Sequence, residues 1–145
     1  MIELGMRQTL YLDHKTDFGV YLCEENNLGK KNAECVLLPG KQVPAKQKKG
    51  DPIDVFVYRD SKDRLIATVH VPKVTLGEVA VLEVLEVTKI GAFLNWGLEK
   101  DLLLPFSEQT VKVKKGEKYL IGLYVDKSDR LCGTMKVYDF LRTDS

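Results

Sequence analysis

The sequence predicts an all-β protein that consists of two tandem five-stranded barrels. Two observations lead to this prediction: short motifs recur in the same order in both halves of the chain, and the segments between them have the composition of β-strands. The chain has 145 residues, enough for one medium domain or two small ones. We expect a first barrel over residues 1–72, a second over 76–137, and a tail over 138–145.

Four motifs occur twice. The first pair, TDFGVYL at residues 16–22 and TKIGAFL at residues 88–94, lies 72 residues apart. Three further pairs lie 66 residues apart, namely prolines 39 and 105, the glycines of KKGD and KKGE at 50 and 116, and the related stretches YRDSKDRLIAT and YVDKSDRLCGT that begin at 58 and 124. The two spacings differ because the first copy has a longer loop, CEENNLGKKNAEC. Surface loops accept such insertions at little entropic cost.

The segments between the motifs are typical of β-strands. VAVLEVLEVTKI alternates in part, and IDVFVYRD and YLIGLYVD are rich in β-branched and aromatic residues. RDSKDRL and VDKSDRL predict hairpin turns, and the polar segments after Pro39 and Pro105 are too short for more than one helical turn. Five strands in so small a unit cannot protect the edges of an open sheet, so each unit is expected to close into a barrel.

This motif order resembles that of the S-one domain, the RNA-binding OB-fold repeat. Its second strand usually reads Phe-Gly-Ala-Phe, and FGVYL and IGAFL are similar to that pattern. The longer stretch KIGAFLNWGLEKDLLLPFSEQ also resembles the bacterial virulence factor B family, whose members are similar to strings of such barrels followed by a winged-helix domain. The resemblance implies two S-one-like OB barrels from the N-terminal portion of a regulatory protein that acts on virulence gene expression, with single-stranded RNA or DNA as its partner.

Aromatic and cationic side chains are the candidate binding residues. Bases stack on exposed rings of an OB barrel, at about 1–3 kcal/mol for each stack, and we expect the motif glycine to let two rings reach one surface. The arginines match the family's position after the fourth strand, and lysine clusters between the third and fourth strands can follow phosphates. The predicted RNA-binding residues are Phe18, Tyr21, Arg64, Phe93, Trp96, Arg130, Lys41, Lys48, Lys49, Lys114 and Lys115.

The same residues also allow structural interpretations. Phe18 and Phe93 can equally belong to the core, whereas Tyr21 and Trp96 are expected to be partly exposed because their polar ends favour water. Each arginine and its aspartate, Asp60–Arg64 and Asp126–Arg130, can simply close a hairpin as a surface ion pair of about 0–1 kcal/mol.

A departure from the S-one pattern supports a second function. The domain usually carries a histidine in the turn after the third strand, where this chain has Pro39 and Pro105. The alternative hypothesis is therefore that the barrels are degenerate and serve as a protein-interaction or spacer module for a C-terminal nucleic-acid-binding domain.

Composition excludes several other classes. The net charge of +1 argues against binding by overall charge, and no stretch reaches the roughly 18 apolar residues of a membrane helix. The three cysteines lack the spacing of a zinc site or disulfide framework, and neither His14 nor His70 has a counterpart in the second unit. We expect a cytoplasmic monomer without a signal peptide, membrane association, catalytic residues, cofactor or metal.

Overall fold

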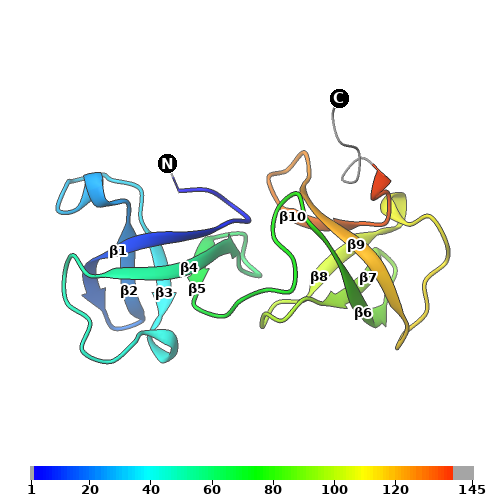
Figure 1. The fold of residues 1–145 in the computed structure, drawn as a ribbon, viewed down its shortest axis with the longest axis horizontal. Coiled ribbons are helices and arrows are strands. Elements are labelled where there is room, and N and C mark those ends of the chain that lie inside the picture. The colour runs from blue at the N-terminus through cyan, green and yellow to red at the C-terminus, as the bar shows by residue number, and fades with distance from the viewer. Residues whose placement is uncertain (1, 139–145) are drawn as a thin grey trace. The chain divides into compact units, whose positions relative to one another are not determined.

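The structure, a computed structural model, describes residues 2–138 and divides between Val71 and Pro72 into two compact units. Each unit contains five β-strands in a barrel-like sheet, which confirms the predicted fold class (Figure 1). The predicted tail, residues 138–145, lies outside the described residues except for Tyr138.

The first unit, barrel 1, is a closed barrel. Its strands are β1 (Arg7–Thr16), β2 (Gly19–Cys23), β3 (Val36–Pro39), β4 (Pro52–Arg59) and β5 (Leu65–Thr68), and their order around the barrel is β1-β2-β3-β5-β4. All neighbours are antiparallel except β3 and β5, which run parallel. Two 3-10 helices, η1 (Glu25–Asn27) and η2 (Gly40–Gln42), lie in the long loop after β2 and directly after β3.

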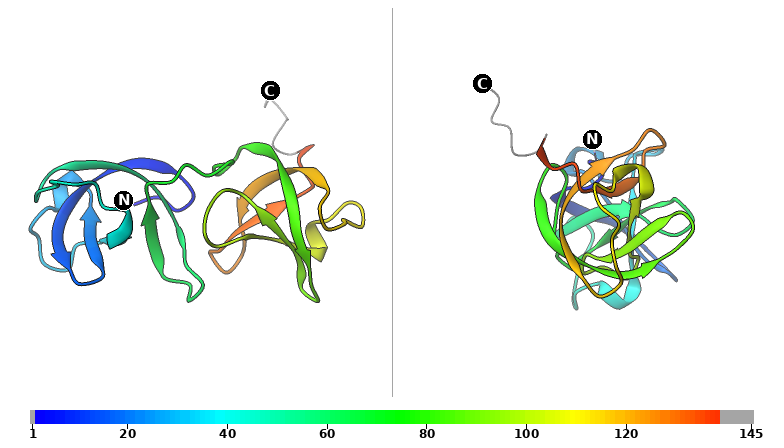
Figure 2. Two further views of the ribbon diagram at one scale, coloured as in Figure 1. Left: turned by 90° about the horizontal axis from the view of Figure 1, so that it is seen from below. Right: turned by 90° about the vertical axis from the view of Figure 1, so that its right-hand side faces the viewer.

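The second unit, barrel 2, repeats this arrangement. Its strands are β6 (Val79–Val87), β7 (Gly91–Asn95), β8 (Leu102–Pro105), β9 (Lys118–Val125) and β10 (Leu131–Thr134), and their order is β10-β9-β6-β7-β8. The outer strands β8 and β10 lie side by side, so the sheet curls around its interior (Figure 2). A 3-10 helix, η3 (Phe106–Glu108), follows β8 as η2 follows β3, and the predicted single turn after each third strand is confirmed.

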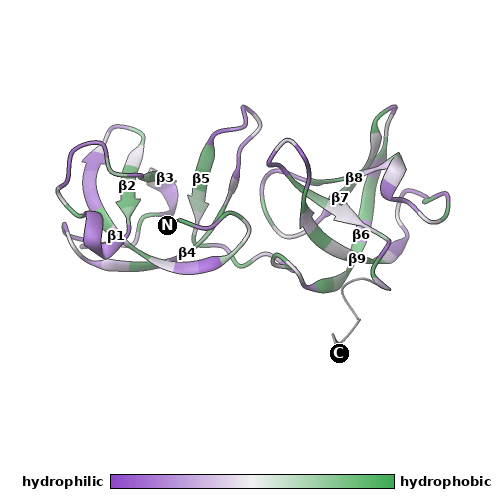
Figure 3. Cartoon of the chain, turned by 90° about the horizontal axis from the view of Figure 1, so that it is seen from above, coloured by the Kyte–Doolittle hydropathy of each residue, from purple (hydrophilic) through white to green (hydrophobic). Residues whose placement is uncertain are grey.

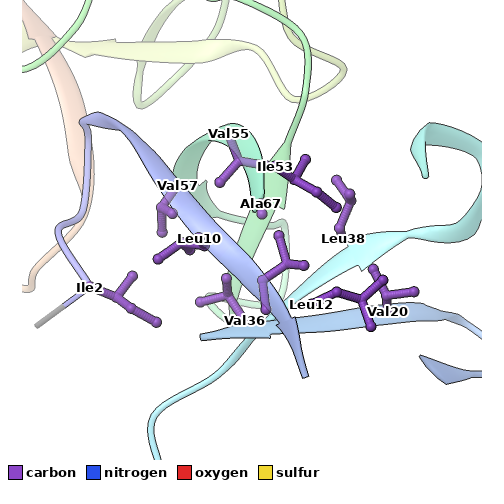
Figure 4. Packing of buried hydrophobic residues seen from close by; sticks show 11 residues of the cluster. Ile2, Leu10, Leu12, Val20, Val36, Leu38, Ile53, Val55, Val57 and Ala67 are labelled. Atoms are coloured by element: carbon purple, nitrogen blue, oxygen red, sulfur yellow. The ribbon is translucent and has the colours of Figure 1, made fainter. Parts of the chain in front are cut away.

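Alternating residues of the strands form the core of each barrel. In barrel 1 these side chains point inward from all five strands (Figure 4), and Figure 3 shows β2 and β5 as largely hydrophobic. The inward-facing strand residues of barrel 1 are Leu10, Leu12, Val20, Leu22, Val36, Leu38, Ile53, Val55, Val57 and Ala67. Burying apolar area at roughly 25 cal/mol per Å² is the main force that closes the barrel.

The threonine of the first repeated motif closes the β1–β2 and β6–β7 hairpins. Thr16 Oγ1 donates a hydrogen bond to the Gly19 carbonyl at 3.1 Å, and it accepts one from the Phe18 N–H at 3.2 Å. Thr88 Oγ1 makes the same two bonds with Gly91 and Ile90, at 2.9 and 3.3 Å. The recurrence of threonine three residues before glycine therefore encodes one turn structure that is used twice.

The repeated aspartates close the β4–β5 and β9–β10 hairpins. Asp60 Oδ1 accepts hydrogen bonds from the N–H groups of Lys62 and Arg64, at 2.9 and 3.0 Å. Asp126 Oδ1 accepts the equivalent bonds from Ser128 and Arg130, at 2.8 and 3.0 Å. Side-chain capping of this kind satisfies turn N–H groups that no strand can pair. The predicted hairpin turns are confirmed.

Candidate nucleic-acid interface

A row of four side chains crosses the outer surface of barrel 1. On β2, Val20 and Leu22 are buried in the core, so Tyr21 between them faces outward and is partly exposed, as expected. Tyr21 lies opposite His14 on β1 and opposite Leu37 on β3, and Leu37 pairs with Ile66 on β5. Cross-strand partners face the same side of a sheet. We call His14, Tyr21, Leu37 and Ile66 the outer row of barrel 1.

His14 faces outward because β1 contains a β-bulge. The pairing shifts between Leu12, which lies opposite Leu22, and His14, which lies opposite Tyr21, and this leaves Asp13 as the extra residue. Leu12 points into the core (Figure 4), so strict alternation would turn His14 inward as well. The bulge instead places the imidazole against the Tyr21 ring, with centroids 5.0 Å apart and planes 18° from parallel.

Asp13 holds this histidine and the long loop after β2. Its Oδ1 accepts a hydrogen bond from the Gly29 N–H at 2.8 Å, and its Oδ2 lies 2.7 Å from His14 Nδ1. Because a carboxylate only accepts hydrogen bonds, Nδ1 carries the proton in this contact. The bond from Gly29, followed by that from His14, lowers the pKa of Asp13. Asp13 is therefore ionised and fixes the orientation of the imidazole ring.

The repeated Lys-Lys-Gly motif brings lysines to the bulge. The Gly50 N–H donates to the Leu12 carbonyl at 2.7 Å, and the Leu12 N–H donates to the Asp51 carbonyl at 3.0 Å. Lys48 and Lys49 directly precede Gly50 and are exposed. The charge of Lys49 contributes to the lowered pKa of Asp13. A turn that occurs in both barrels thus places positive charge near the outer row of barrel 1.

Barrel 2 has the same backbone but different chemistry at this place. Its bulge lies between Val84 and Glu86, so Glu86 faces Phe93 as His14 faces Tyr21. Phe93 is partly exposed on the outer side of β7 and lies opposite Leu103 on β8. Lys115 Nζ lies 3.8 Å from Glu86 Oε2. A carboxylate and its partner lysine therefore stand where barrel 1 has an imidazole.

Phe18 lies at the tip of the β1–β2 hairpin and is 78% exposed, so its interpretation as a core residue is wrong. Ile90 holds the same place in barrel 2 and is 60% exposed. Both motif glycines approach the neighbouring strand closely: a Cβ on Gly19 would lie 2.1 Å from the Leu38 carbonyl oxygen, so the glycine admits a close backbone.

Trp96 does not belong to the surface. The expectation that it is partly exposed is wrong, because its side chain is only 2% exposed and its Nε1–H donates to the Lys100 carbonyl at 2.6 Å. The polar end of the ring is therefore satisfied by the backbone instead of by water. A ring that is buried to this extent offers no face to a base.

Arg64 directly precedes β5, two residues before Ile66 of the outer row. Its Nε and Nη2 each lie 3.0 Å from Asp60 Oδ2, so the pair closes the hairpin as the structural interpretation expects. Burial acts to raise the pKa of Asp60, but hydrogen bonds from the Arg64 and Lys62 N–H groups and from the guanidinium lower it overall. The Arg64 side chain is still 69% exposed, which leaves its planar face accessible.

The other predicted cations are also exposed. Lys41 lies in η2, Lys114 and Lys115 lie in the loop before β9, and Arg130 lies in the β9–β10 turn, where its N–H donates to Asp126. Lys48 and Lys49 in barrel 1, and Lys114 and Lys115 in barrel 2, directly precede the glycine of the Lys-Lys-Gly motif, whose N–H group bonds to the strand at the bulge.

Sequence reasoning missed part of this surface. Leu37 and Ile66 are ordinary strand residues whose place depends on register, and His14 depends on the bulge. Phe106 is 52% exposed in η3, at the place of Gly40 in barrel 1. Gly91, at the start of β7, pairs with Pro105, so Phe106 directly follows the residue that lies opposite the hairpin. An aromatic residue after Pro105 in a polar segment was the available signal.

The cysteines behave as packed thiols. All three are free, and burial is the largest cause that raises the pKa of Cys23 to about 11 and of Cys132 to about 12.

Within residues 2–138, no group of three or more His, Cys, Asp and Glu side chains is arranged to hold a metal ion. No helix in that range is long and apolar enough to cross a bilayer.

Two small five-stranded barrels with outward-facing rings and adjoining cations define the class of OB-type nucleic-acid-binding modules. The sequence profile of the S1 domain (S-one) matches residues 4–70 and 76–136. The chain therefore belongs to the S1-domain family and carries two copies of the domain, as the motifs predicted. S1 domains indicate nucleic-acid binding.

Several known proteins are similar to this chain. The YitL protein of Bacillus subtilis is 30% identical over 132 residues, which are 88% of this chain and 42% of YitL. Conserved virulence factor B of Staphylococcus aureus is 28% identical over 59% of this chain and 30% of its own length, which confirms the predicted family resemblance. A Streptococcus pneumoniae multidomain protein with nucleic acid binding domains shares the fold, with a TM-score of 0.72, 24% identity, and coverage of 94% of this chain and 47% of that one. The chain thus spans less than half the length of each of these relatives.

Proposed function

We propose that this chain is a single-stranded RNA-binding module of low sequence specificity. The observation that carries the proposal is the pair of accessible rings in barrel 1, Phe18 at the hairpin tip and Tyr21 on β2. Each ring can stack a base, and stacking tolerates every base because all four have a π-face. Arg64 precedes Ile66 of the outer row by two residues, and the charge of Lys49 acts on Asp13 beside His14, so these two cations are the candidates for contact with the phosphates.

The charge distribution supports modest, salt-sensitive affinity. A net charge of +1 gives little long-range attraction, so phosphate binding depends on the local lysines and arginines. Neutralising phosphates with such side chains releases counterions, and the affinity falls as salt rises.

The test is a fluorescence anisotropy titration with labelled single-stranded RNA of about 16 nucleotides, the upper end of the site size of one OB fold. We expect binding at low salt that weakens at moderate salt, and a parallel titration with DNA of the same sequence distinguishes an RNA-specific module from one that binds either nucleic acid. Phe18→Ala and Tyr21→Ala should reduce the affinity while the melting temperature stays close to that of the wild type. Absence of RNA binding even at low salt would rule out the proposal for this chain.

We further propose a cytoplasmic, monomeric and non-catalytic protein that contributes to the control of virulence gene expression. The relatives named Conserved virulence factor B support the biological role. Size-exclusion chromatography coupled to light scattering tests the monomer, and loss of the corresponding gene in its host should change the levels of virulence transcripts.

A second candidate function is a spacer or protein-interaction module. The Glu86–Lys115 pair favours it for barrel 2, because a carboxylate beside Phe93 repels phosphates. In that case barrel 2 would tolerate Phe93→Ala without any change in RNA affinity, and only the stability of the barrel would fall.

A further inference from the structure

We infer that His14 is a further nucleic-acid contact, which extends the Tyr21 stacking surface and adds positive charge in its protonated form. The affinity of barrel 1 for single-stranded RNA then rises as the pH falls. This inference rests on the proposed function, and it assigns to one barrel a titratable contact that the other lacks.

The geometry places His14 for contact with a ligand. Its side chain is 54% exposed, and the bulge at Asp13 turns it away from the core side of β1. The ring lies nearly parallel to that of Tyr21. In such a stack each ring covers one face of the other, so a base that joins the stack can lie on the outer face of His14, and histidine is among the side chains on which RNA bases stack.

Protonation of His14 changes the net charge of the group of side chains around it. Asp13 on β1 contacts Nδ1, and β2 contributes the Tyr21 ring and the Cys23 thiol, which lies 3.9 Å from Asp13 Oδ1. The charge of Lys49, from the loop before β4, also acts on Asp13. With His14 neutral, the charge of Asp13 is opposed by that of Lys49. With His14 protonated, the Asp13–His14 pair is neutral and Lys49 is available to a phosphate.

Linkage gives the direction of the effect. Histidine is the side chain whose charge can change between about pH 5 and 8, a range in which proteins and RNA are both stable. A polyanion that binds better when His14 is protonated must be bound more tightly at low pH. In barrel 2 the equivalent residue is Glu86, which carries a negative charge and cannot stack, so barrel 2 offers no such contact.

The sequence provides a matched control, because the chain contains only two histidines and His70 is also exposed. The probe is a labelled uridine oligonucleotide, whose bases do not titrate between the two pH values used. Titrations at about pH 5.5 and about pH 8 compare the wild type with His14→Ala, His14→Phe and His70→Ala, and melting curves confirm that each variant is folded.

We expect the wild type and His70→Ala to bind about threefold to tenfold more tightly at the lower pH. By linkage, a tenfold change in affinity corresponds to a difference of about one unit in the pKa of the linked group between free and bound protein. His14→Phe should keep the affinity seen at the higher pH and lose the pH dependence. His14→Ala should be weaker at both. Unchanged affinity and pH dependence in both His14 variants would overturn the inference and leave RNA binding intact, whereas no binding by the folded wild type would overturn the proposed function itself.

Discussion

Gly19 packs directly against the backbone of Leu38, and the same contact recurs in barrel 2 between Gly91 and Leu104. A Cβ on Gly19 would lie 2.1 Å from the Leu38 carbonyl oxygen and 2.8 Å from the Gly40 nitrogen. The φ of Gly19 is also 149°, in the region that favours glycine. The motif glycine therefore serves the barrel, because β2 can approach β3 only without a side chain here.

Gly19→Ala is expected to destabilise barrel 1 by about 2–4 kcal/mol, because backbone atoms cannot move aside as a flexible side chain does. Gly50→Ala is the matched control: its φ of 88° is also positive, but a Cβ would meet nothing within 4 Å, and the cost should be about 1 kcal/mol. Denaturant unfolding followed by circular dichroism measures both. Equal losses would show that the close approach to Leu38 is unimportant.

Trp96→Ala is expected to destabilise barrel 2 by about 3–5 kcal/mol, the range for removing a large buried aromatic side chain. Trp96→Phe should cost less, because it mainly leaves the Lys100 carbonyl without its donor, at about 1–3 kcal/mol. RNA affinity of the folded Trp96→Phe protein should equal that of the wild type. A clear loss of affinity without loss of stability would show that Trp96 contributes to RNA binding.

The fold was predictable because its determinants are local and occur twice. The Thr-x-x-Gly hairpin, the Asp-x-x-x-Arg turn and the single turn after each third strand all depend on residues close together in the sequence. Inward and outward positions alternate along β2, and Tyr21 is partly exposed, as its polar end led us to expect.

The surface was less predictable because it depends on register. The outward position of His14 requires the extra residue at Asp13, and strict alternation would turn the imidazole inward. The exposure of Trp96 was predicted wrongly because its indole N–H donates to a backbone carbonyl. Every residue has such a carbonyl, so the sequence does not reveal this partner. The position of Phe106 beside the hairpin depends on η3, which follows β8 as η2 follows β3.

Phe18→Ala should separate binding from stability. Because the side chain is 78% exposed, the free energy of unfolding should change by no more than about 0.5 kcal/mol. Loss of one base stack should weaken RNA binding by about 1–3 kcal/mol, or roughly fivefold to 150-fold. Ile90→Ala, at the same hairpin tip in barrel 2, should have a much smaller effect. Anisotropy titrations and melting curves on the two variants decide between a binding and a structural role.

Acid should destabilise both barrels through the turn aspartates. Burial acts to raise the pKa of Asp60 and of Asp126, but the hydrogen bonds in their hairpin turns lower both overall. A folded-state pKa below the unfolded value stabilises the protein above about pH 4, and this stabilisation is lost as the pH falls through the folded value. Denaturation midpoints measured at about pH 7, 4 and 2.5 should fall in that order. Asp60→Asn should reduce the decrease, because it removes one of the titrating groups.

Glu86→Gln should strengthen the binding of RNA by barrel 2. The substitution keeps the shape of the side chain opposite Phe93, removes a negative charge from the surface, and frees Lys115 from its contact at 3.8 Å. Both side chains of that ion pair are largely exposed, so the stability should change by no more than about 1 kcal/mol. Anisotropy titrations should show a severalfold gain in affinity at low salt that diminishes at moderate salt, because the added attraction is electrostatic. Glu99→Gln changes the net charge equally at an exposed loop position. An equal gain from Glu99→Gln would mean that overall charge, and not the place of Glu86 beside Phe93, limits binding.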